Sequence, residues 1–230
     1  MKKYINFKKA AVAIALASAV VSCNEDKFLT VNPTGSLAQA QLVSKAGVEG
    51  ALIGAYSMLG AKGYSRFAGP NNWVFGSILG GDANKGTDAG DYTAINPIQR
   101  YEASPVDGDI NSAWNAKYEG ISRANTVIRL ANASTALTAD DKKRIINEAK
   151  FLRGHFYFEL KKIFNSVPYI DETVDYGTGI DKIANSPDFW GKIEADFKAA
   201  YDNLPETMTD AGRAIICFNA LNTRCSIVPG

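Results

Sequence analysis

The sequence predicts a mainly α-helical protein, built as a stack of helix pairs with long loops. Apolar residues recur at intervals of three and four in several segments, as they do along one face of an α-helix, and strand-like alternation is scarce. Aromatic and small residues share these faces, and short turns join the segments. Helix pairs of this kind bury their apolar faces against neighbouring pairs, which favours a repeat stack.

The first expected helix follows Ser44, whose hydroxyl can cap it, and runs to about Leu59. Residues 63–70 interrupt the helical pattern, and residues 73–79 form a second apolar segment. Residues 80–107 are rich in Gly, Asp, Asn and Pro and are expected to form a long loop. A loop of this length without a period of its own is usually functional or disordered.

The clearest helical pattern starts at Asp109 or Asn111, and the next helix follows Thr138, a suitable cap. Asp140 and Asp141 favour the positive N-terminal end of that second helix. The expected buried stripe of the first is Trp114, Tyr118, Ile121, Asn125 and Ile128, and that of the second is Ile145, Ala149, Leu152, Phe156 and Ile163.

A short extended segment, residues 167–170, is expected after this pair. The last expected helix starts near Ser186-Pro187, since proline is common at early helical positions, and Pro205 stops it. Its expected apolar side is Trp190, Ile193, Phe197, Ala200 and Leu204. Both Trp114 and Trp190 are therefore assigned to the core.

The N-terminal residues indicate export and lipid attachment. Lysines 2, 3, 8 and 9 precede an apolar run, residues 10–21, which is too short to span a bilayer but suits a signal peptide. Ser22 before Cys23 resembles the lipobox of bacterial lipoproteins, in which cleavage precedes an acylated cysteine. We expect a signal peptide over 1–22, a lipid anchor at Cys23 and a tether over 23–41. The alternative is an ordinary secretory signal with an incidental cysteine.

Two acidic residues, Glu25 and Asp26, follow the expected anchor. They resemble the signal that sends lipoproteins of Bacteroidetes-type bacteria to the outer face of the outer membrane. The alternative is the start of a solvated linker.

Composition excludes some classes of function. The apolar fraction of 46% suits a packed core, and without residues 1–22 the chain has 21 basic and 24 acidic residues, a net charge of −3. No basic stripe with interleaved aromatic residues is present, so we expect no nucleic-acid partner. The single histidine, His155, lies among aromatic residues and is expected to pack rather than to catalyse. We expect no enzymatic activity and no cofactor, although a paired-carboxylate hydrolase stays open.

Five motifs in order resemble the SusD/RagB family of outer-membrane lipoproteins. They are Val48-Glu49-Gly50-Ala51 with Gly54-Ala55-Tyr56, Trp114 with Tyr118, Ile121 and Ala124-Asn125, the run Glu148 to Leu160, Phe164 with Val167-Pro168, and Ile193 with Asp196-Phe197, Ala200 and Leu204-Pro205. The resemblance covers about residues 23–214. It implies a body made of a stack of tetratricopeptide-like helix pairs. It also implies a surface lipoprotein that covers a TonB-dependent, SusC-like outer-membrane transporter and captures nutrients, most often glycans.

The chain departs from the family near its end. Residues 42–214 are expected to form the family's N-terminal helical domain, incomplete at its C-terminal side, because family members are longer. Residues 215–230, with Cys217 and Cys225, lack the amphipathic pattern expected there. We hypothesise a reading-frame slip near residue 215; the alternative is a divergent natural terminus.

Glycan sites combine aromatic faces with polar side chains that bond sugar hydroxyls. The expected ligand-binding residues are Trp73, Asp82, Asn84, Asp88 and Tyr92. The alternatives are a core position for Trp73 and a plain solvated loop for the polar residues. Residues 82–93 also partly match a calcium loop, but Gly86 comes one place early and Thr93 replaces the bidentate Glu at the last position, so no metal site is assigned. Glu148 and Arg153 are interpreted as structural partners between repeats.

The sequence therefore favours glycan capture without chemistry. The second hypothesis is a tetratricopeptide-like scaffold that binds protein partners only. An exported hydrolase is the third.

Overall fold

The computed structural model describes residues 39–60, 73–86, 88–174 and 182–205. The expected signal peptide, Cys23 and residues 215–230 lie outside these ranges. The elements in chain order are α3 (Gln39–Leu42), α4 (Lys45–Tyr56), the 3-10 helix η1 (Ser57–Gly60), the π-helix η3 (Trp73–Ile78), the 3-10 helix η4 (Thr93–Ile95), α5 (Asn96–Gln99), α6 (Gly108–Ala133), α7 (Ala139–Phe164), β1 (Val167–Pro168), β2 (Asn185–Ser186) and α8 (Trp190–Asn203). The mainly α class is confirmed.

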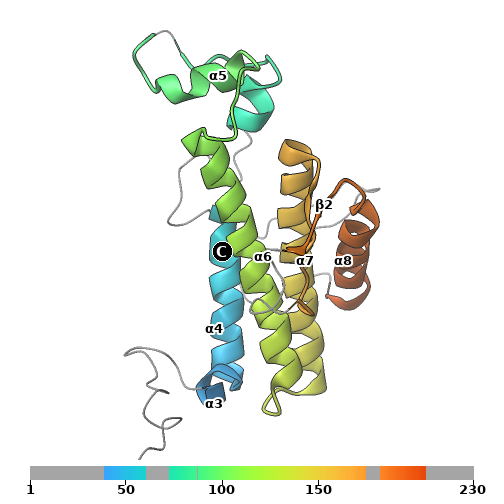
Figure 1. Cartoon of the computed structure of the whole chain (residues 1–230). Helices are drawn as coiled ribbons and strands as arrows, with labels where there is room; N and C mark the ends of the chain where they lie inside the picture. Colours follow the sequence, from blue (N-terminus) through green and yellow to red (C-terminus); the bar gives the residue numbers. More distant parts are fainter. Residues whose placement is uncertain (1–38, 61–72, 87, 175–181, 206–230) are drawn as a thin grey trace, which may run out of the picture. The chain divides into compact units, whose positions relative to one another are not determined.

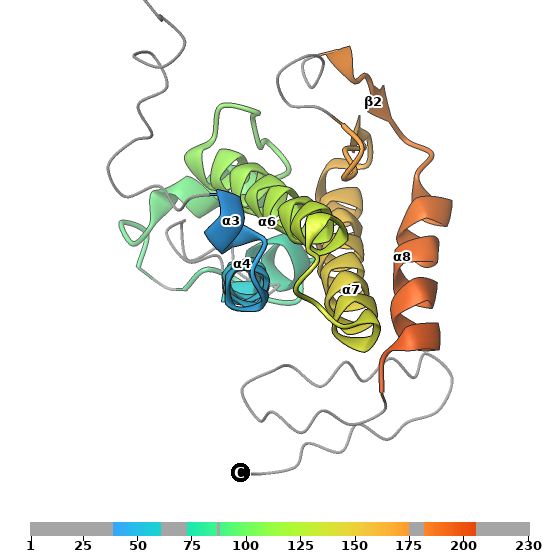
Figure 2. The ribbon, with the colours of Figure 1, turned by 90° about the horizontal axis from the view of Figure 1, so that it is seen from below.

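The long helices α6 and α7 form the centre of the stack. A short turn joins them, α4 packs against α6, and α8 packs against α7 (Figure 1). Seen along the helices, the four elements follow one another in the order α4, α6, α7, α8 (Figure 2). The arrangement is a stack of helix pairs, as expected from the sequence.

Two of the expected helix caps are present. The Ser44 hydroxyl accepts a hydrogen bond from the Gly47 amide at 3.1 Å, and the Thr138 hydroxyl accepts one from the Asp141 amide at 3.1 Å. Each satisfies an amide that the first turn of a helix leaves without an intrahelical partner. The sequence located the starts of α4 and α7 correctly.

The expected start of the last helix is wrong. Ser186 pairs with Val167 in the short antiparallel ladder of β1 and β2, so Pro187 lies before the helix and α8 begins only at Trp190. Pairing between strands holds Ser186 in an extended conformation, which overrides the local preference of the Ser-Pro pair for a helix start.

The main core lies between α4, α6, α7 and α8. Its largest fully buried side chains include Tyr157, Phe156, Phe189, Leu52, Met58, Ile121, Ile128, Ile145 and Leu152. At Gly120 of α6 the ring of Phe156 from α7 lies so close that a Cβ atom would be 2.5 Å from it. A glycine is therefore required where the two long helices approach each other.

The two tryptophans assigned to the core differ. Trp114 packs against it, with its ring 4.8 Å from that of Tyr118 and 5.0 Å from that of Phe164. Trp190 is 42% exposed, so its core assignment is wrong. It is the first residue of α8, and its ring contacts that of Phe158, which is also exposed.

A buried ionic network links α6, α7 and α8. The Arg153 guanidinium donates to both carboxylate oxygens of Asp196 at 2.7 and 2.8 Å, to Glu172, and to the Asn125 side-chain oxygen at 2.9 Å. Burial lowers the pKa of Arg153, but the hydrogen bonds and charges of these carboxylates outweigh burial and raise it above its usual value. The bidentate geometry is the strong form of such a pair.

Glu148 serves another junction. It accepts hydrogen bonds from Tyr56 at 2.9 Å and from Arg144 at 2.7 Å, which joins α4 to α7. The structural roles predicted for Glu148 and Arg153 are confirmed, but each has its own partners and the two do not form a pair.

The segment that follows α7 is held by side chains of the helices. The Tyr157 hydroxyl donates to the Ile170 carbonyl at 2.9 Å and accepts from the Ile170 amide at 2.6 Å. Asn125 of α6 donates to the same carbonyl at 3.0 Å. Both backbone groups of Ile170 are thus bonded to the long helices.

Candidate functional site

The segment of residues 73–107 is organised around a small apolar cluster of its own. Val74, Ile78, Ile95 and Ile98 are buried there, and Ala83 and Tyr92 pack against them. The segment contains the short helices η3, η4 and α5, whereas the sequence predicted a long loop from residue 80 onward. Helices of three or four residues are too short to produce a detectable period, which explains the difference.

The structure places the predicted ligand-binding residues on this one segment. Trp73 is 37% exposed on η3, and Asp82, Asn84 and Asp88 are exposed. Ala83 and Tyr92 both pack on the small apolar cluster, so the chain next to Asp82 and Asn84 and the chain at Tyr92 lie against the same group of residues. Trp73 is thus partly exposed at the start of this segment.

Tyr92 is held differently from the other predicted residues. It adopts a left-handed conformation, with φ of 37°, and its hydroxyl lies 2.8 and 2.7 Å from the two carboxylate oxygens of Asp109. Asp109 is buried at the start of α6. Tyr92 therefore anchors the loop to α6, and its hydroxyl proton is already donated.

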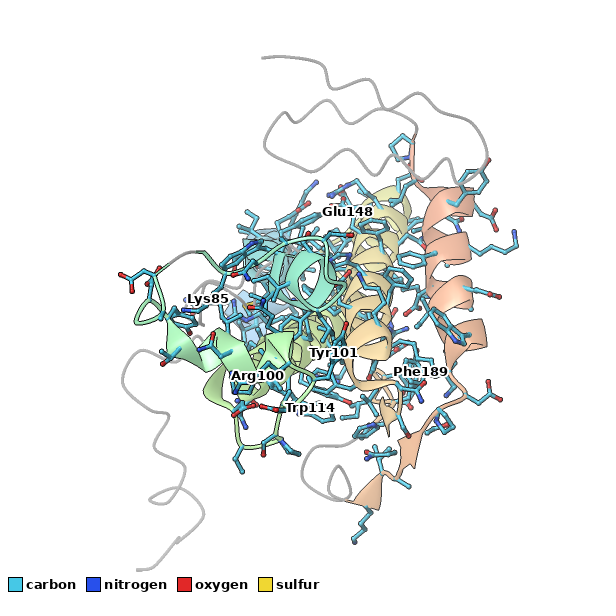
Figure 3. The ribbon with its side chains drawn as sticks, turned by 90° about the horizontal axis from the view of Figure 1, so that it is seen from above. Lys85, Arg100, Tyr101, Trp114, Glu148 and Phe189 are labelled. Carbon is cyan, nitrogen blue, oxygen red and sulfur yellow. The ribbon has the colours of Figure 1, made fainter. Side chains whose placement is uncertain are left out.

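The sequence interpretation missed Tyr101. Its side chain is 74% exposed, yet its hydroxyl donates a 2.6 Å hydrogen bond to the Leu79 carbonyl, and its φ of 59° is unusual for a residue other than glycine. Arg100 beside it forms an ion pair with Glu102 at 2.8 Å (Figure 3). The signal that could have indicated Tyr101 is an aromatic residue within a loop rich in Gly, Asp and Asn, the same signal that indicated Tyr92.

Lys85 occupies the part of the loop that resembles a calcium site. Its ammonium nitrogen donates to the carbonyls of Asp88 at 3.0 Å, Ala89 at 3.4 Å and Asp91. In the described part of the chain, no three His, Cys, Asp or Glu side chains are grouped so that they could hold a metal ion. The Lys85 ammonium group therefore occupies three of the carbonyl oxygens of this loop.

A shallow hollow lies elsewhere, between the start of α7 and the end of α8. Asp140, Asp141, Lys143, Arg144, Asn203 and Pro205 line it. It contains charged side chains but no aromatic ring, so it lacks the flat apolar surface that a sugar ring requires. The segment of residues 73–107 is the better candidate site for a carbohydrate.

His155 is half-buried beside an aromatic ring, which is consistent with its predicted packing role. Its ring contacts the ring of Phe156 at 5.5 Å, and burial lowers its pKa below the usual value. Desolvation of this kind disfavours the charged imidazolium.

The described residues thus define a helix-pair protein of the tetratricopeptide-like class, with a separate segment that presents aromatic and polar side chains. Residues 27–215 match the SusD-like family described as "Starch-binding associating with outer membrane", and the chain belongs to this family. The family resemblance found in the sequence is confirmed.

The relatives are longer proteins. "SusD-like protein P2" of Formosa agariphila is 27% identical over 214 residues, which are 90% of this chain and 39% of that protein. A "SusD-like protein" of Bacteroides ovatus is 28% identical over 119 residues, 50% of this chain and 21% of that protein. The chain thus spans well under half the length of these relatives.

Solved structures show the same fold. A "Laminarin binding SusD-like protein" superimposes with a TM-score of 0.60 at 23% identity, covering 74% of this chain and 36% of that one. "Surface glycan-binding protein A from Bacteroides fluxus" superimposes with a TM-score of 0.53 at 22% identity, covering 68% of this chain and 33% of that one.

None of the described helices of this chain has the length and apolarity needed to cross a membrane.

Proposed function

We propose that this protein is an outer-membrane lipoprotein that captures glycans at the cell surface and delivers them to a TonB-dependent, SusC-like transporter. The family match over residues 27–215 carries the proposal, and two of the similar structures are described as binding laminarin or surface glycans. Capture and delivery require binding and no catalytic chemistry. Attachment through Cys23 would hold the protein at the membrane, because several acyl chains give a stable anchor.

We place the sugar contacts on the segment of residues 73–107. Tyr101 presents an exposed ring whose hydroxyl is fixed to the Leu79 carbonyl, so little side-chain freedom is lost when a sugar ring stacks on it. Trp73 adds a second partly exposed aromatic side chain. Carboxylates and amides accept or donate hydrogen bonds to sugar hydroxyls, which assigns that role to Asp82, Asn84 and Asp88.

Tyr101 provides the sharpest test. We expect Tyr101→Ala to weaken binding to soluble glycans, with laminarin and starch as first probes, by about tenfold or more, the effect of losing one well-packed aromatic contact. Affinity electrophoresis in native gels containing each glycan measures the change. Tyr201→Ala is the matched control, because Tyr201 is 66% exposed but lies on α8.

Equal retention of both tyrosine variants would contradict this location of the site. An absence of retention across a broad glycan panel would contradict glycan capture itself. Labelling of the protein with radioactive palmitate in cells tests the anchor at Cys23 separately.

A protein-binding scaffold without a glycan ligand is the second candidate. The exposed aromatic pair Trp190 and Phe158, at the junction of α7 and α8, favours it, because exposed aromatic residues are enriched at protein interfaces. Co-purification with the transporter, in a protein that no glycan retains, would support this alternative. Turnover of a glycan by the purified protein would instead support a hydrolase.

A further inference from the structure

We propose that Lys85 is a built-in cation of the loop, one that takes the place of a bound metal ion and positions the glycan-binding side chains around it. The first half of this inference concerns the order of the loop alone. The second half, the positioning of ligand contacts, rests on the proposed function.

The geometry of the Lys85 ammonium group carries the inference. An ammonium group has three N–H donors and no acceptor. Here it meets three backbone carbonyls, those of Asp88, Ala89 and Asp91, which converge on it from one short stretch of chain. Donors and acceptors match in number, so the ammonium group is fully bonded within the loop.

Local hydrogen bonds shape the two turns of the loop. The Asn84 side-chain oxygen accepts from the Gly86 amide at 3.1 Å, and the Asp88 carboxylate accepts from the Gly90 amide at 2.8 Å. Each of these bonds spans two residues and fixes a single turn. The hydrogen bonds of the Lys85 ammonium group reach carbonyls three to six residues further along the chain. They therefore connect the turn at Asn84 to the turn at Asp88.

Converging carbonyls favour a positively charged partner. Their partial negative charges repel one another, and calcium loops resolve this by directing backbone and side-chain oxygens at a divalent ion. In this chain the sequence resembles such a loop in part, while the lysine side chain supplies the charge from within. The loop is therefore expected to keep its conformation without a metal ion.

The same bonds connect the tip of the loop to its anchor. Asp91 directly precedes Tyr92, whose hydroxyl is bonded to Asp109 of α6. Lys85 donates to the Asp91 carbonyl and so connects the stretch that carries Asp82 and Asp88 to the residue next to Tyr92. Lys85 thus acts as a positioning residue rather than as a ligand contact.

The test compares Lys85→Met and Lys85→Arg with the control Lys143→Met in the full chain. Met keeps an unbranched side chain, one atom shorter than that of lysine, and removes the charge. Lys143 is an exposed lysine of α7 outside the loop. Amide hydrogen exchange of Gly90 and Asp91 reports the order of the loop. We expect exchange about tenfold faster in Lys85→Met, corresponding to one charge-assisted hydrogen bond, partial protection in Lys85→Arg and no change in the control.

Two further measurements separate the claims. Exchange in the unmodified protein should be the same with EDTA and with added calcium. Affinity for laminarin or starch, whichever the protein retains, should fall about tenfold in Lys85→Met while the unfolding midpoint stays the same.

Each outcome decides one half of the inference. Unchanged exchange in Lys85→Met, or a calcium-dependent loop in the unmodified protein, overturns the built-in cation. Faster exchange with unaltered glycan affinity overturns the positioning role. If the unmodified protein retains neither glycan, the positioning role falls with the proposed function, while faster exchange in Lys85→Met still upholds the built-in cation.

Discussion

The long helices and the segment of residues 73–107 are ordered by different forces. Between α6 and α7 the side chains of Phe156 and Tyr157 are at most 1% exposed, and a buried ion pair adds a specific link to α8. In the loop segment four aliphatic residues form the buried cluster. Hydrogen bonds from Lys85 to the Asp88 carbonyl and from Tyr92 to Asp109 hold the exposed part of the loop. The helical body thus has an extensive apolar core, whereas the loop segment combines a small apolar cluster with local polar bonds.

This difference matters for binding. The loop segment holds two tyrosines with positive φ, Tyr92 and Tyr101, a conformation that costs on the order of 1–3 kcal/mol for such residues. A segment shaped by hydrogen bonds can hold exposed aromatic rings in fixed positions without burying them. Changes in the body should therefore alter stability, and changes in the loop should alter binding.

The largest expected effect on stability is at Arg153. Arg153→Met leaves the Asp196 carboxylate, 7% exposed, without its main partner inside the stack. We expect a loss of about 3–5 kcal/mol in the free energy of unfolding, because an uncompensated buried charge is costly. Urea denaturation measures the loss.

The double variant Arg153→Met with Asp196→Leu is the control, since it removes both charges. It should recover most of the stability, as replacement of a whole buried pair by apolar residues often does. A loss below about 1 kcal/mol in the single variant would contradict the role given to this network.

A pair of glycine variants tests the close contact of the long helices. Gly120→Ala places a methyl group 2.5 Å from the buried Phe156 ring, so we expect a loss of about 1–2 kcal/mol. Gly50→Ala in α4 meets no atom within 4 Å and should stabilise the protein by up to about 1 kcal/mol through helix propensity. Thermal unfolding of both variants should show shifts of opposite sign; shifts of the same sign would contradict the predicted contact.

The smallest expected effect is a dependence on pH through His155. Burial is the main cause of its lowered pKa; Glu159 opposes the shift, and Lys117 and Lys162 add to it. The folded state therefore binds fewer protons than the unfolded state, whose histidine titrates near pH 6.5. Stability should be complete above that pH and fall as the pH drops below it, with a slope of at most about 1.4 kcal/mol per pH unit.

Because His155 is the single histidine of the chain, a variant isolates this effect. His155→Gln should remove the slope between about pH 7.5 and 5.5, a range that lies above the usual carboxylate pKa values. Urea denaturation at several pH values measures it. An unchanged slope in the variant would assign the effect to another group.

The long helices could be predicted from the sequence because their apolar period extends over many turns. Ser44 and Thr138 also revealed their caps, since capping depends on residues close in sequence. The start of α8 was misplaced because Ser186 pairs with Val167, a contact between residues that are distant in sequence. Periodicity cannot show such a contact.

The candidate site was predicted less completely. The sequence indicated the segment and the residues Trp73, Asp82, Asn84, Asp88 and Tyr92, whose roles in binding stay predictions. It could not show that the Tyr92 hydroxyl bonds to Asp109, or that Tyr101 is both exposed and fixed. Those properties depend on where the short helices place each side chain in space.

The bonds at Ile170 have a consequence for motion. A hinge needs residues whose backbone torsions can change, yet both backbone groups of Ile170 are bonded to Tyr157, and its carbonyl is also bonded to Asn125. This position is thus unsuited to act as a pivot between α7 and the chain that leads to α8. The start of the segment that follows α7 is therefore expected to move together with α6 and α7 as one unit.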